Sequence, residues 1–577
     1  VLDAAMTAGH ILLENGAEIF RVEETIDRIC HHFGVQSENA FVLSNGIFLT
    51  SGDEHEKRFA RVEHIPVRGA QLHRVAAVNQ LSREIEEGKY TLPEIREKLE
   101  NGPVVGTLIV DNEVEIGTGV TYNIMGKIRG KSSDYQILVG GHYDMHFFGF
   151  QDDNCAVGLV LAMAKAMKDS GYQPENDIVF CLHGAEEWGA SYSQFDWTVG
   201  AWEMINHVHP EWVGKTLAFI NFELPAYEFD TYTTTYSAPE MFAMLDYFAN
   251  DYAYSPEPEG CFADGVLTEG YQTYTYSDDF SYYAAGVPST VNGFLLQKDM
   301  ETVFPFYIDY YHTQYDTPDT YNEAVMRFNI AYYGALAMYI DQMPAADLDF
   351  TAQTARLTAA MDKDVMAQAG ADVEAYQAAL AELDEAATAM RAKVVEVNRA
   401  YEAAREAGDE AAMAQLRETG RTLTSRNLEA FRYAQKHLLG LMPHEAPQET
   451  ITLCEAIIDC LKDGDPATAV DEYAWTVNNV LEWYAMYFSP EVIAVQDDMN
   501  WGADNQDNLY WGTDINFDKA DVDAATRSLY VRYDDKGGDF TEEIAIYEKA
   551  IETEKAKLAA KAQAEAEAMA GLADILR

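Results

Sequence analysis

The chain has few basic residues, and it has no long apolar run. Of its 577 residues, 40 are Lys or Arg and 96 are Asp or Glu, so its formal net charge is −56. Such a negative chain repels nucleic acid and anionic membrane surfaces, and we expect no nucleic-acid partner. No apolar run reaches the roughly 18 residues that a membrane-spanning helix needs. We therefore expect no membrane span.

Paired cysteines are also absent. The six cysteines are scattered, and no two have the CxxC spacing of a zinc ribbon or a redox motif, so buried thiols are expected. No charged-then-apolar signal segment begins the sequence. A cytoplasmic location is the default expectation, and a secreted one holds if a signal segment precedes Val1.

The length exceeds what one hydrophobic core supports, and three stretches differ in their patterns. Residues 1–100 have helical patterns on both sides of FVLSNGIFLTS, which predicts a strand pair around Asn45 and Gly46 within a small α+β domain. Residues 101–350 alternate strands such as YQILVGGHYD and DIVFCLHGAEE with helices such as AVGLVLAMAKAMKDSG, which predicts an α/β sheet with crossovers. Such sheets bind ligands beyond the carboxyl ends of their strands.

Residues 351–577 are rich in Ala, Glu, Lys and Gln, and they predict a helical, coiled-coil-like domain. Two long amphipathic segments, beginning VEAYQAALAELDE and EEIAIYEKAIETE, are expected to pack antiparallel. The stretch ADNQDNLYWGTDINFDKADVD between them predicts a long polar excursion. Packing or formation of a homodimer is the expected role of this region.

Each strand end in the middle region carries residues that can bind a metal ion. Two zinc ions bridged by one carboxylate need about two imidazoles and three carboxylates, with a further carboxylate free to take a proton from water. A helix start suits the bridging aspartate, and spacing alone leaves two aspartates open for that role. A carboxylate near the first histidine can orient its ring. The candidates are His142, Asp144, Asp152, Asp153, Glu186, Glu187, Glu223 and His312.

Residues 106–345 contain five motifs in order: GGHYD, an aspartate at a helix start, AEEWG, INFE and YHTQYDT. On these motifs, this stretch resembles the di-zinc exopeptidase family of aminopeptidases and glutamate carboxypeptidases. The resemblance implies a zinc-exopeptidase-type mixed sheet flanked by helices, a peptide substrate and two Zn²⁺ ions per chain. It implies no role for His146. By the resemblance, His142 and Glu223 hold one zinc, Glu187 and His312 hold the other, Asp152 bridges them, Glu186 is the general base and Asp144 supports His142.

The sequence departs from the family pattern in two places. Glu223 stands where many members carry aspartate, which moves the ligand oxygen by one methylene. Few residues separate position 106 from His142, so the elements that usually precede this strand pair are expected to be absent.

The number of arginines indicates which end of a peptide substrate is bound. A carboxypeptidase is expected to bind the terminal carboxylate with arginine, and an aminopeptidase needs acids to hold an ammonium group. Residues 101–350 contain only Arg129 and Arg327, neither with an obvious place in the site, whereas acids and tyrosines abound, as in YSDDFSYYAAGVP. An aminopeptidase is therefore the preferred interpretation.

The first hundred residues resemble a different family. The similarity rests on AGHILLENGAEIFRVEETIDRICHHFGV, NGIFLTS and VRGAQLHRVAAVNQLSREIEEG. On these stretches, residues 3–100 are similar to the soluble N-terminal domain of the threonine/serine exporter family. Because transport needs membrane helices, this arrangement suggests a fusion. Two alternatives to the aminopeptidase stay open: a non-catalytic scaffold with a degenerate peptidase core, and a soluble regulatory module of an amino-acid transport system.

Overall fold

The computed structural model describes the chain except for residues 16, 18, 36, 44–45, 52–58, 65–71, 101–118, 189–197, 268–270, 273–276, 295–305, 308, 439–444, 475–476, 478–519 and 521. The chain forms two compact units, Val1–Gly117 and Thr118–Arg577. No helix in the described ranges is long and apolar enough to cross a membrane. The expected excursion at 503–523 falls almost entirely outside the described residues, and the division at residues 100 and 350 remains a prediction.

The first unit is a small α+β structure, as the sequence patterns predicted. Strands β1 and β2 pair antiparallel with Leu43 opposite Gly46, and β2 pairs antiparallel with β3. Helices α1 and α2 pack closely, since a Cβ atom on Gly9 would lie 2.6 Å from Ile26 Cδ1. The elements are α1 (Leu2–Glu14), α2 (Ile19–His32), β1 (Ser37–Leu43), β2 (Gly46–Ser51), β3 (Phe59–His64), α3 (Leu72–Glu86) and α4 (Leu92–Glu100).

A seven-stranded mixed sheet is the centre of the second unit, and it confirms the expected fold class. The order is β11-β9-β12-β7-β5-β6-β4. Strands β12, β7, β5 and β6 run parallel, while β4 pairs antiparallel with β6 at one edge. The strands are β4 (Ile124–Ile128), β5 (Gln136–His142), β6 (Asp177–His183), β7 (Thr216–Asn221), β9 (Thr235–Ser237), β11 (Tyr271–Gln272) and β12 (Ser289–Asn292).

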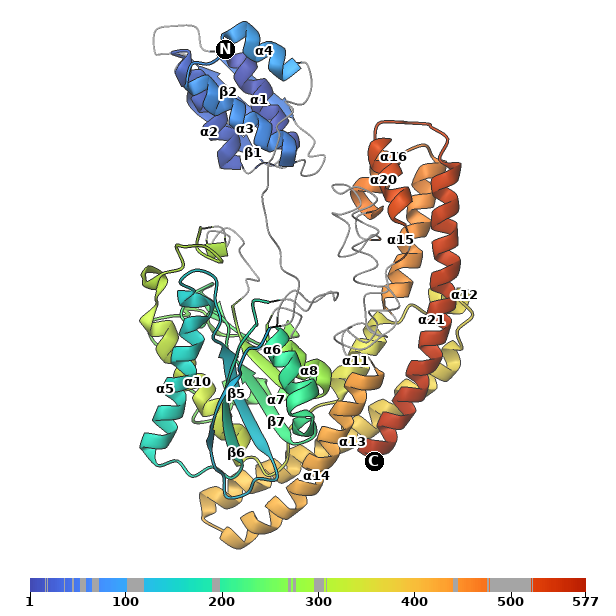
Figure 1. Ribbon diagram of the computed structural model, residues 1–577. Helices are drawn as coiled ribbons and strands as arrows, with labels where there is room; N and C mark the ends of the chain where they lie inside the picture. The colour runs from blue at the N-terminus through green and yellow to red at the C-terminus, as the bar shows by residue number, and fades with distance from the viewer. Residues whose placement is uncertain are drawn as a thin grey trace. The chain divides into compact units, whose positions relative to one another are not determined.

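Helices cover both faces of this sheet (Figure 1). Helices α5 (Cys155–Ser170) and α10 (Glu323–Gln342) pack on one face, where Leu159 and Leu336 join the main hydrophobic core. On the other face, α6 (Val199–Glu203), the π-helical turn Met204–Val208 and α8 (Asp279–Ala285) cover Leu138 and Phe219. The shorter elements are β8 (Tyr232–Thr233), β10 (Gly265–Val266) and α7 (Phe242–Asn250).

The region after residue 350 is helical, as predicted. Its helices are α11 (Thr351–Ala360), α12 (Lys363–Gln368), α13 (Val373–Ala407), α14 (Glu410–His437), α15 (Glu445–Lys462), α16 (Pro466–Ala469), α20 (Asp523–Val531) and α21 (Thr541–Leu576). Their apolar side chains share one continuous core with the sheet and with α10.

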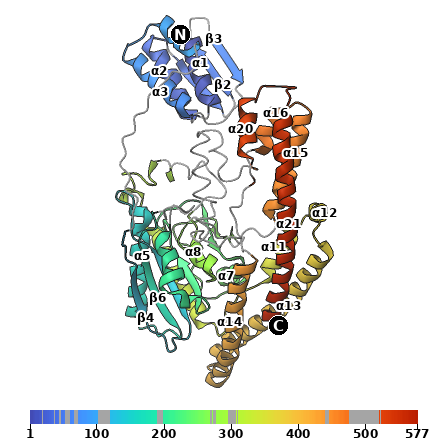
Figure 2. The ribbon, with the colours of Figure 1, turned by 45° about the vertical axis from the view of Figure 1, so that its right-hand side comes forward.

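The expected antiparallel packing of the two longest helices is wrong. Tyr376 of α13 donates a hydrogen bond to Glu565 of α21 at 2.8 Å, and Glu382 of α13 pairs with Arg577 at 3.4 Å. Residue numbers rise together along both helices, so α13 and α21 run in the same direction where they touch, and α14 is the helix that folds back beside α13 (Figure 2). An amphipathic pattern specifies which face is buried and leaves the direction of the partner open.

The segment after α10 is held by side chains from two of these helices. Asn398 of α13 accepts the amide of Ala345 at 3.1 Å and donates to its carbonyl at 3.0 Å. On α14, the Thr424 hydroxyl accepts the amide of Ala346 at 2.9 Å, and Asn427 donates to the Ala346 carbonyl at 2.8 Å. These bonds satisfy the backbone amides and carbonyls of the buried residues Ala345 and Ala346.

Candidate metal centre

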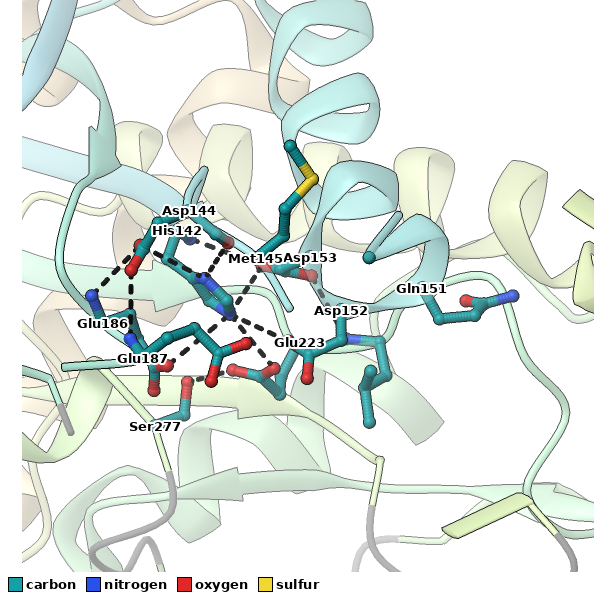
Figure 3. Close-up of polar contacts among 12 residues, drawn as sticks. His142, Asp144, Met145, Gln151, Asp152, Asp153, Glu186, Glu187, Glu223 and Ser277 are labelled. Atoms are coloured by element: carbon teal, nitrogen blue, oxygen red, sulfur yellow. Dashed lines mark hydrogen bonds and ion pairs between the residues drawn. The ribbon is translucent and has the colours of Figure 1, made fainter. Parts of the chain in front are cut away.

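Four of the expected site residues lie at or just beyond the carboxyl ends of three parallel strands, β5, β6 and β7, and Asp152 lies in the π-helical turn Phe150–Asn154 before α5 (Figure 3). His142 is the last residue of β5, Glu186 and Glu187 follow β6, and Glu223 follows β7. Parallel pairing in register sets these strand ends side by side.

His142 is buried with its Nε2 atom facing the carboxylates. It is 1% exposed, and its Nδ1 atom donates a hydrogen bond to the backbone carbonyl of Asp144 at 3.0 Å. The Asp144 carboxylate lies 3.6 Å from the same nitrogen, but it accepts the backbone amides of Glu186 and Glu187, each at 3.1 Å. Asp144 therefore joins the loops after β5 and β6, and its carbonyl fixes the ring of His142.

Asp152 lies between the two imidazoles. Its Oδ1 atom is 3.1 Å from His142 Nε2, and its Oδ2 atom is 3.0 Å from His312 Nε2. The neighbouring Asp153 is used differently, because its carboxylate accepts the amides of His142 and Leu224, both at 3.3 Å. Of the two aspartates that spacing left open, Asp152 alone contacts both histidines among the described residues.

His312 and Glu187 form one side of the cluster. His312 Nε2 lies 3.3 Å from Glu187 Oε2, and the ring stacks on Tyr311 with centroids 3.8 Å apart. Burial acts to lower the pKa of His312, but Asp152 and Glu187 outweigh it and raise that pKa to about 9.

Glu223 forms the other side. Its Oε1 atom lies 3.6 Å from His142 Nε2, and its Oε2 atom accepts the Ser277 hydroxyl at 2.5 Å. Asn292 of β12 accepts the Glu223 amide and donates to its carbonyl, both at 2.8 Å. Burial raises the pKa of Glu223 to about 7.

Glu186 is a buried carboxylate set slightly back from the others. It is 6% exposed, and its Oε2 atom lies 3.8 Å from His142 Nε2. Burial raises its pKa well above the ordinary value, and the charge of Glu223 adds to this although His142 opposes it.

These residues fit a zinc site. Among the described residues, Glu187 Oε1 is buried without a hydrogen-bond partner, and His142 Nε2 and Asp152 Oδ2 contact only ionisable groups of the cluster itself, which is unusual for buried polar atoms. Histidine nitrogen and carboxylate oxygen are ligands that zinc prefers. Within the described part of the chain, the ion pairs of this cluster involve histidines and no Lys or Arg. The sets His142–Asp153–Glu223 and His142–Glu186–Glu187 each have ligand atoms within 4.8 Å of one another.

Comparison with known proteins agrees with both resemblances. Residues 123–334 match the family model described as Peptidase family M28. The centre lies in an M28-like region. Residues 3–101 match the model described as Putative threonine/serine exporter, so the two expected families occur in the expected order. Over 87 residues the chain is 31% identical to a Glutamate carboxypeptidase 2 homolog of Caenorhabditis briggsae, covering 14% of this chain and 11% of that protein.

Solved structures also align with part of the chain. BSAP, a zinc aminopeptidase from Bacillus subtilis, is 19% identical with a TM-score of 0.30, over 38% of this chain and 49% of that one. The LapA aminopeptidase of Legionella pneumophila is 20% identical with a TM-score of 0.28, over 37% of this chain and 53% of that one. The chain thus spans about half the length of these two proteins, and about a tenth of the curated relative.

Several residues around the M28-like centre were not assigned from the sequence. Asp316 accepts the amides of Gln151 and Asp152, and it was visible as the last residue of the HTQYD motif. Ser277 and Asn292 hold Glu223; Ser277 belongs to YSDDFSYYAAGVP, a stretch singled out above for its acids and tyrosines, and no sequence pattern marked Asn292. His146 lies 3.2 Å from Glu187, although no motif gave it a role.

Proposed function

We propose that the M28-like region is a zinc-dependent peptide hydrolase that holds two zinc ions. In this proposal His142 and Glu223 hold the inner ion, Glu187 and His312 hold the outer ion, and Asp152 bridges them. The observation that carries the proposal is the position of the Asp152 carboxylate, 3.1 Å from one imidazole and 3.0 Å from the other. A carboxylate with both oxygens facing a histidine is suited to bridging two cations.

Zinc bound in such a site lowers the pKa of water toward neutrality and polarises a peptide carbonyl. The protein supplies the proton acceptor. Glu186 is near His142 Nε2, and its raised pKa suits a group that accepts a proton from water and then donates it to the leaving amine. The Asp144 carboxylate holds the Glu186 amide, and in this way positions that general base.

We further propose that the substrate is bound through a free amino terminus. Arg327 is exposed on α10, where it pairs with Glu323 at a donor–acceptor distance of 2.9 Å. Arg129 follows strand β4, at the edge of the sheet. Neither contacts the centre, so neither is placed to bind the terminal carboxylate that a carboxypeptidase recognises.

The scaffold alternative is less well supported. Glu186 is a buried carboxylate beside the proposed ligands, and it is not itself one of them. A protein that only bound metal or peptide would not need it. No described contact favours the transport-module alternative. A homodimer formed through the helical region remains a prediction.

The test combines metal analysis with a panel of peptides. Zinc-loaded protein is expected to contain two ions and to cleave aminoacyl and amidated peptides. N-acetylated peptides should resist cleavage. Cleavage of N-acetylated peptides together with inactivity on amidated ones would favour a carboxypeptidase, and a folded protein that retains no zinc would contradict the proposal as a whole.

A further inference from the structure

His146 lies beside the outer half of the centre. Its Nε2 atom is 3.2 Å from Glu187 Oε2, and its ring centroid is 4.4 Å from that of His312. His312 Nε2 lies 3.3 Å from the same Glu187 oxygen. Two imidazole nitrogens from different loops thus converge on one carboxylate oxygen, and the set His146–Glu187–His312 has ligand atoms within 4.8 Å of one another.

The loop that carries His146 is fixed on both sides of it. Asn154, at the start of α5, donates to the sulfur of Met145 at 2.9 Å, to the carbonyl of Phe148 at 3.1 Å and to that of Gly149 at 2.9 Å. His146 is therefore presented to Glu187 by a loop that hydrogen bonds hold in place.

The 3.2 Å and 3.3 Å spacings of the two imidazole nitrogens from Glu187 Oε2 match those of ligands around one zinc ion. Ligands bound at 2.0–2.1 Å in tetrahedral geometry lie about 3.3 Å from one another. The Glu187 side chain is 7% exposed, and its Oε1 atom is buried without a hydrogen-bond partner. Glu187 thus has one oxygen that faces two imidazoles and one buried oxygen without a partner, and a cation bound to this carboxylate would offset the cost of burying it.

We propose that His146 is an additional protein ligand of the outer zinc ion. This inference rests on the proposed function. The outer ion then has Asp152, Glu187, His312 and His146, while the inner ion has His142, Asp152 and Glu223. Zinc sites with four protein ligands are typically structural, and those with three keep a position open for water or substrate. By this count the inner ion would be the one that keeps a position for water or substrate, and Glu186 lies 3.8 Å from its ligand His142.

A histidine can also pair with a glutamate without any metal, and the chain provides a matched control. His207 Nδ1 lies 2.8 Å from Glu203 Oε2 on an exposed helical turn, and the described ion pairs of His207 include no second histidine or aspartate. His207→Ala removes an imidazole–carboxylate pair of the same kind at a distance from the centre.

The experiment measures the two metal affinities of the full chain by chelator competition, using Zn²⁺ and Co²⁺. His146→Ala should weaken the binding of one of the two ions by at least about tenfold and should change the visible absorption of the Co²⁺ form, while the affinity for the other ion changes little. His146→Phe keeps a ring against His312 and should lose affinity equally. Added imidazole should restore part of the affinity of His146→Ala. The His207→Ala protein should behave as the unchanged chain does.

The outcomes separate the two proposals. If the unchanged protein binds two ions and both His146 variants hold them with unaltered affinity and Co²⁺ spectrum, the ligand assignment is wrong and the proposed function stands. If His146→Ala weakens binding but His146→Phe does not, the ring supports His312 by packing, and His146 is no ligand. If the unchanged, folded protein binds no transition metal, the proposed function itself fails.

Discussion

The carboxylate of Asp316 accepts the backbone amide of Asp152 at 3.2 Å. The same carboxylate accepts the amide of Gln151 at 2.9 Å. The motif that carries His312 therefore also holds the backbone of Asp152, the proposed bridging residue. The segments that carry His312 and Asp152 are thus positioned together.

Replacing Asp316 with alanine should lower the affinity for both zinc ions by about 10–100-fold, because the two amides lose their acceptor and Asp152 is no longer held. Metal content after dialysis against a weak chelator measures this. Asp319→Ala, an exposed aspartate of the same loop, is the control and should keep both ions. Unchanged metal content in the Asp316 variant would show that Asp152 is held without it.

The single-ligand variants should differ in how many ions they lose. Asp152→Ala should lose both, since Asp152 faces both imidazoles, whereas His142→Ala and His312→Ala should each lose one. Elemental analysis of the folded proteins gives the stoichiometry. Retention of both ions by Asp152→Ala would assign the bridge to another group.

Glu186→Gln should lower turnover by roughly two to four orders of magnitude, because the amide keeps the shape and cannot accept a proton. Both zinc ions should remain bound, since Glu186 is not among the proposed ligands. The measurement is kcat alongside metal content. Full activity of this variant would mean that another group takes the proton.

The hydrogen bonds between Asp177 and the residues of and after edge strand β4 should make the stability of the protein depend on pH in the acid range. Burial acts to raise the pKa of Asp177, but hydrogen bonds from the Gly130 amide at 2.9 Å and the Lys127 ammonium at 3.0 Å outweigh it and lower that pKa. The stabilisation is present above the unfolded pKa of 3.8 and is lost as the pH falls through the lower folded value.

Asp177→Asn should therefore reduce the free energy of unfolding at pH 7 by about 1–3 kcal/mol. The gap to the unchanged protein should close as the pH falls below 4, which urea unfolding at a series of pH values would follow. Asp169→Asn removes an exposed carboxylate that pairs with Lys165, and it should change stability little. A gap that persists at low pH would assign the effect to packing.

Removal of residues 1–117 should leave the metal stoichiometry unchanged. All proposed ligands belong to the second compact unit, Thr118–Arg577. The check is elemental analysis of the shortened protein, with cooperative melting as the control for folding. Loss of zinc from a folded sample would mean that the first unit contributes to the site.

The sequence predicted the strand ends and their order because hydrophobic runs and polar breaks are local signals. Parallel strands then bring those ends together, which is why His142, Glu187 and Glu223 lie in one cluster, and Asp152 and His312 reach it from the turn Phe150–Asn154 and from the segment before Pro318–Thr320. His146 could not be placed, because its position depends on the path of its loop and on Asn154. The direction of α21 relative to α13 was mispredicted, because it depends on the path that the chain takes between these two helices.

The hydrogen bonds from Asn398, Thr424 and Asn427 to residues 345–346 determine where this protein can be divided. The family match ends at residue 334. A protein that ended near residue 350 would nevertheless lose the side chains that form hydrogen bonds with the buried backbone groups of residues 345 and 346. It would also uncover the side of α10 that faces the helical region. An exchange of this helical region for another would have to retain an amide or hydroxyl group at each of the three positions, so the M28-like and helical regions are expected to be stable only when they are expressed together.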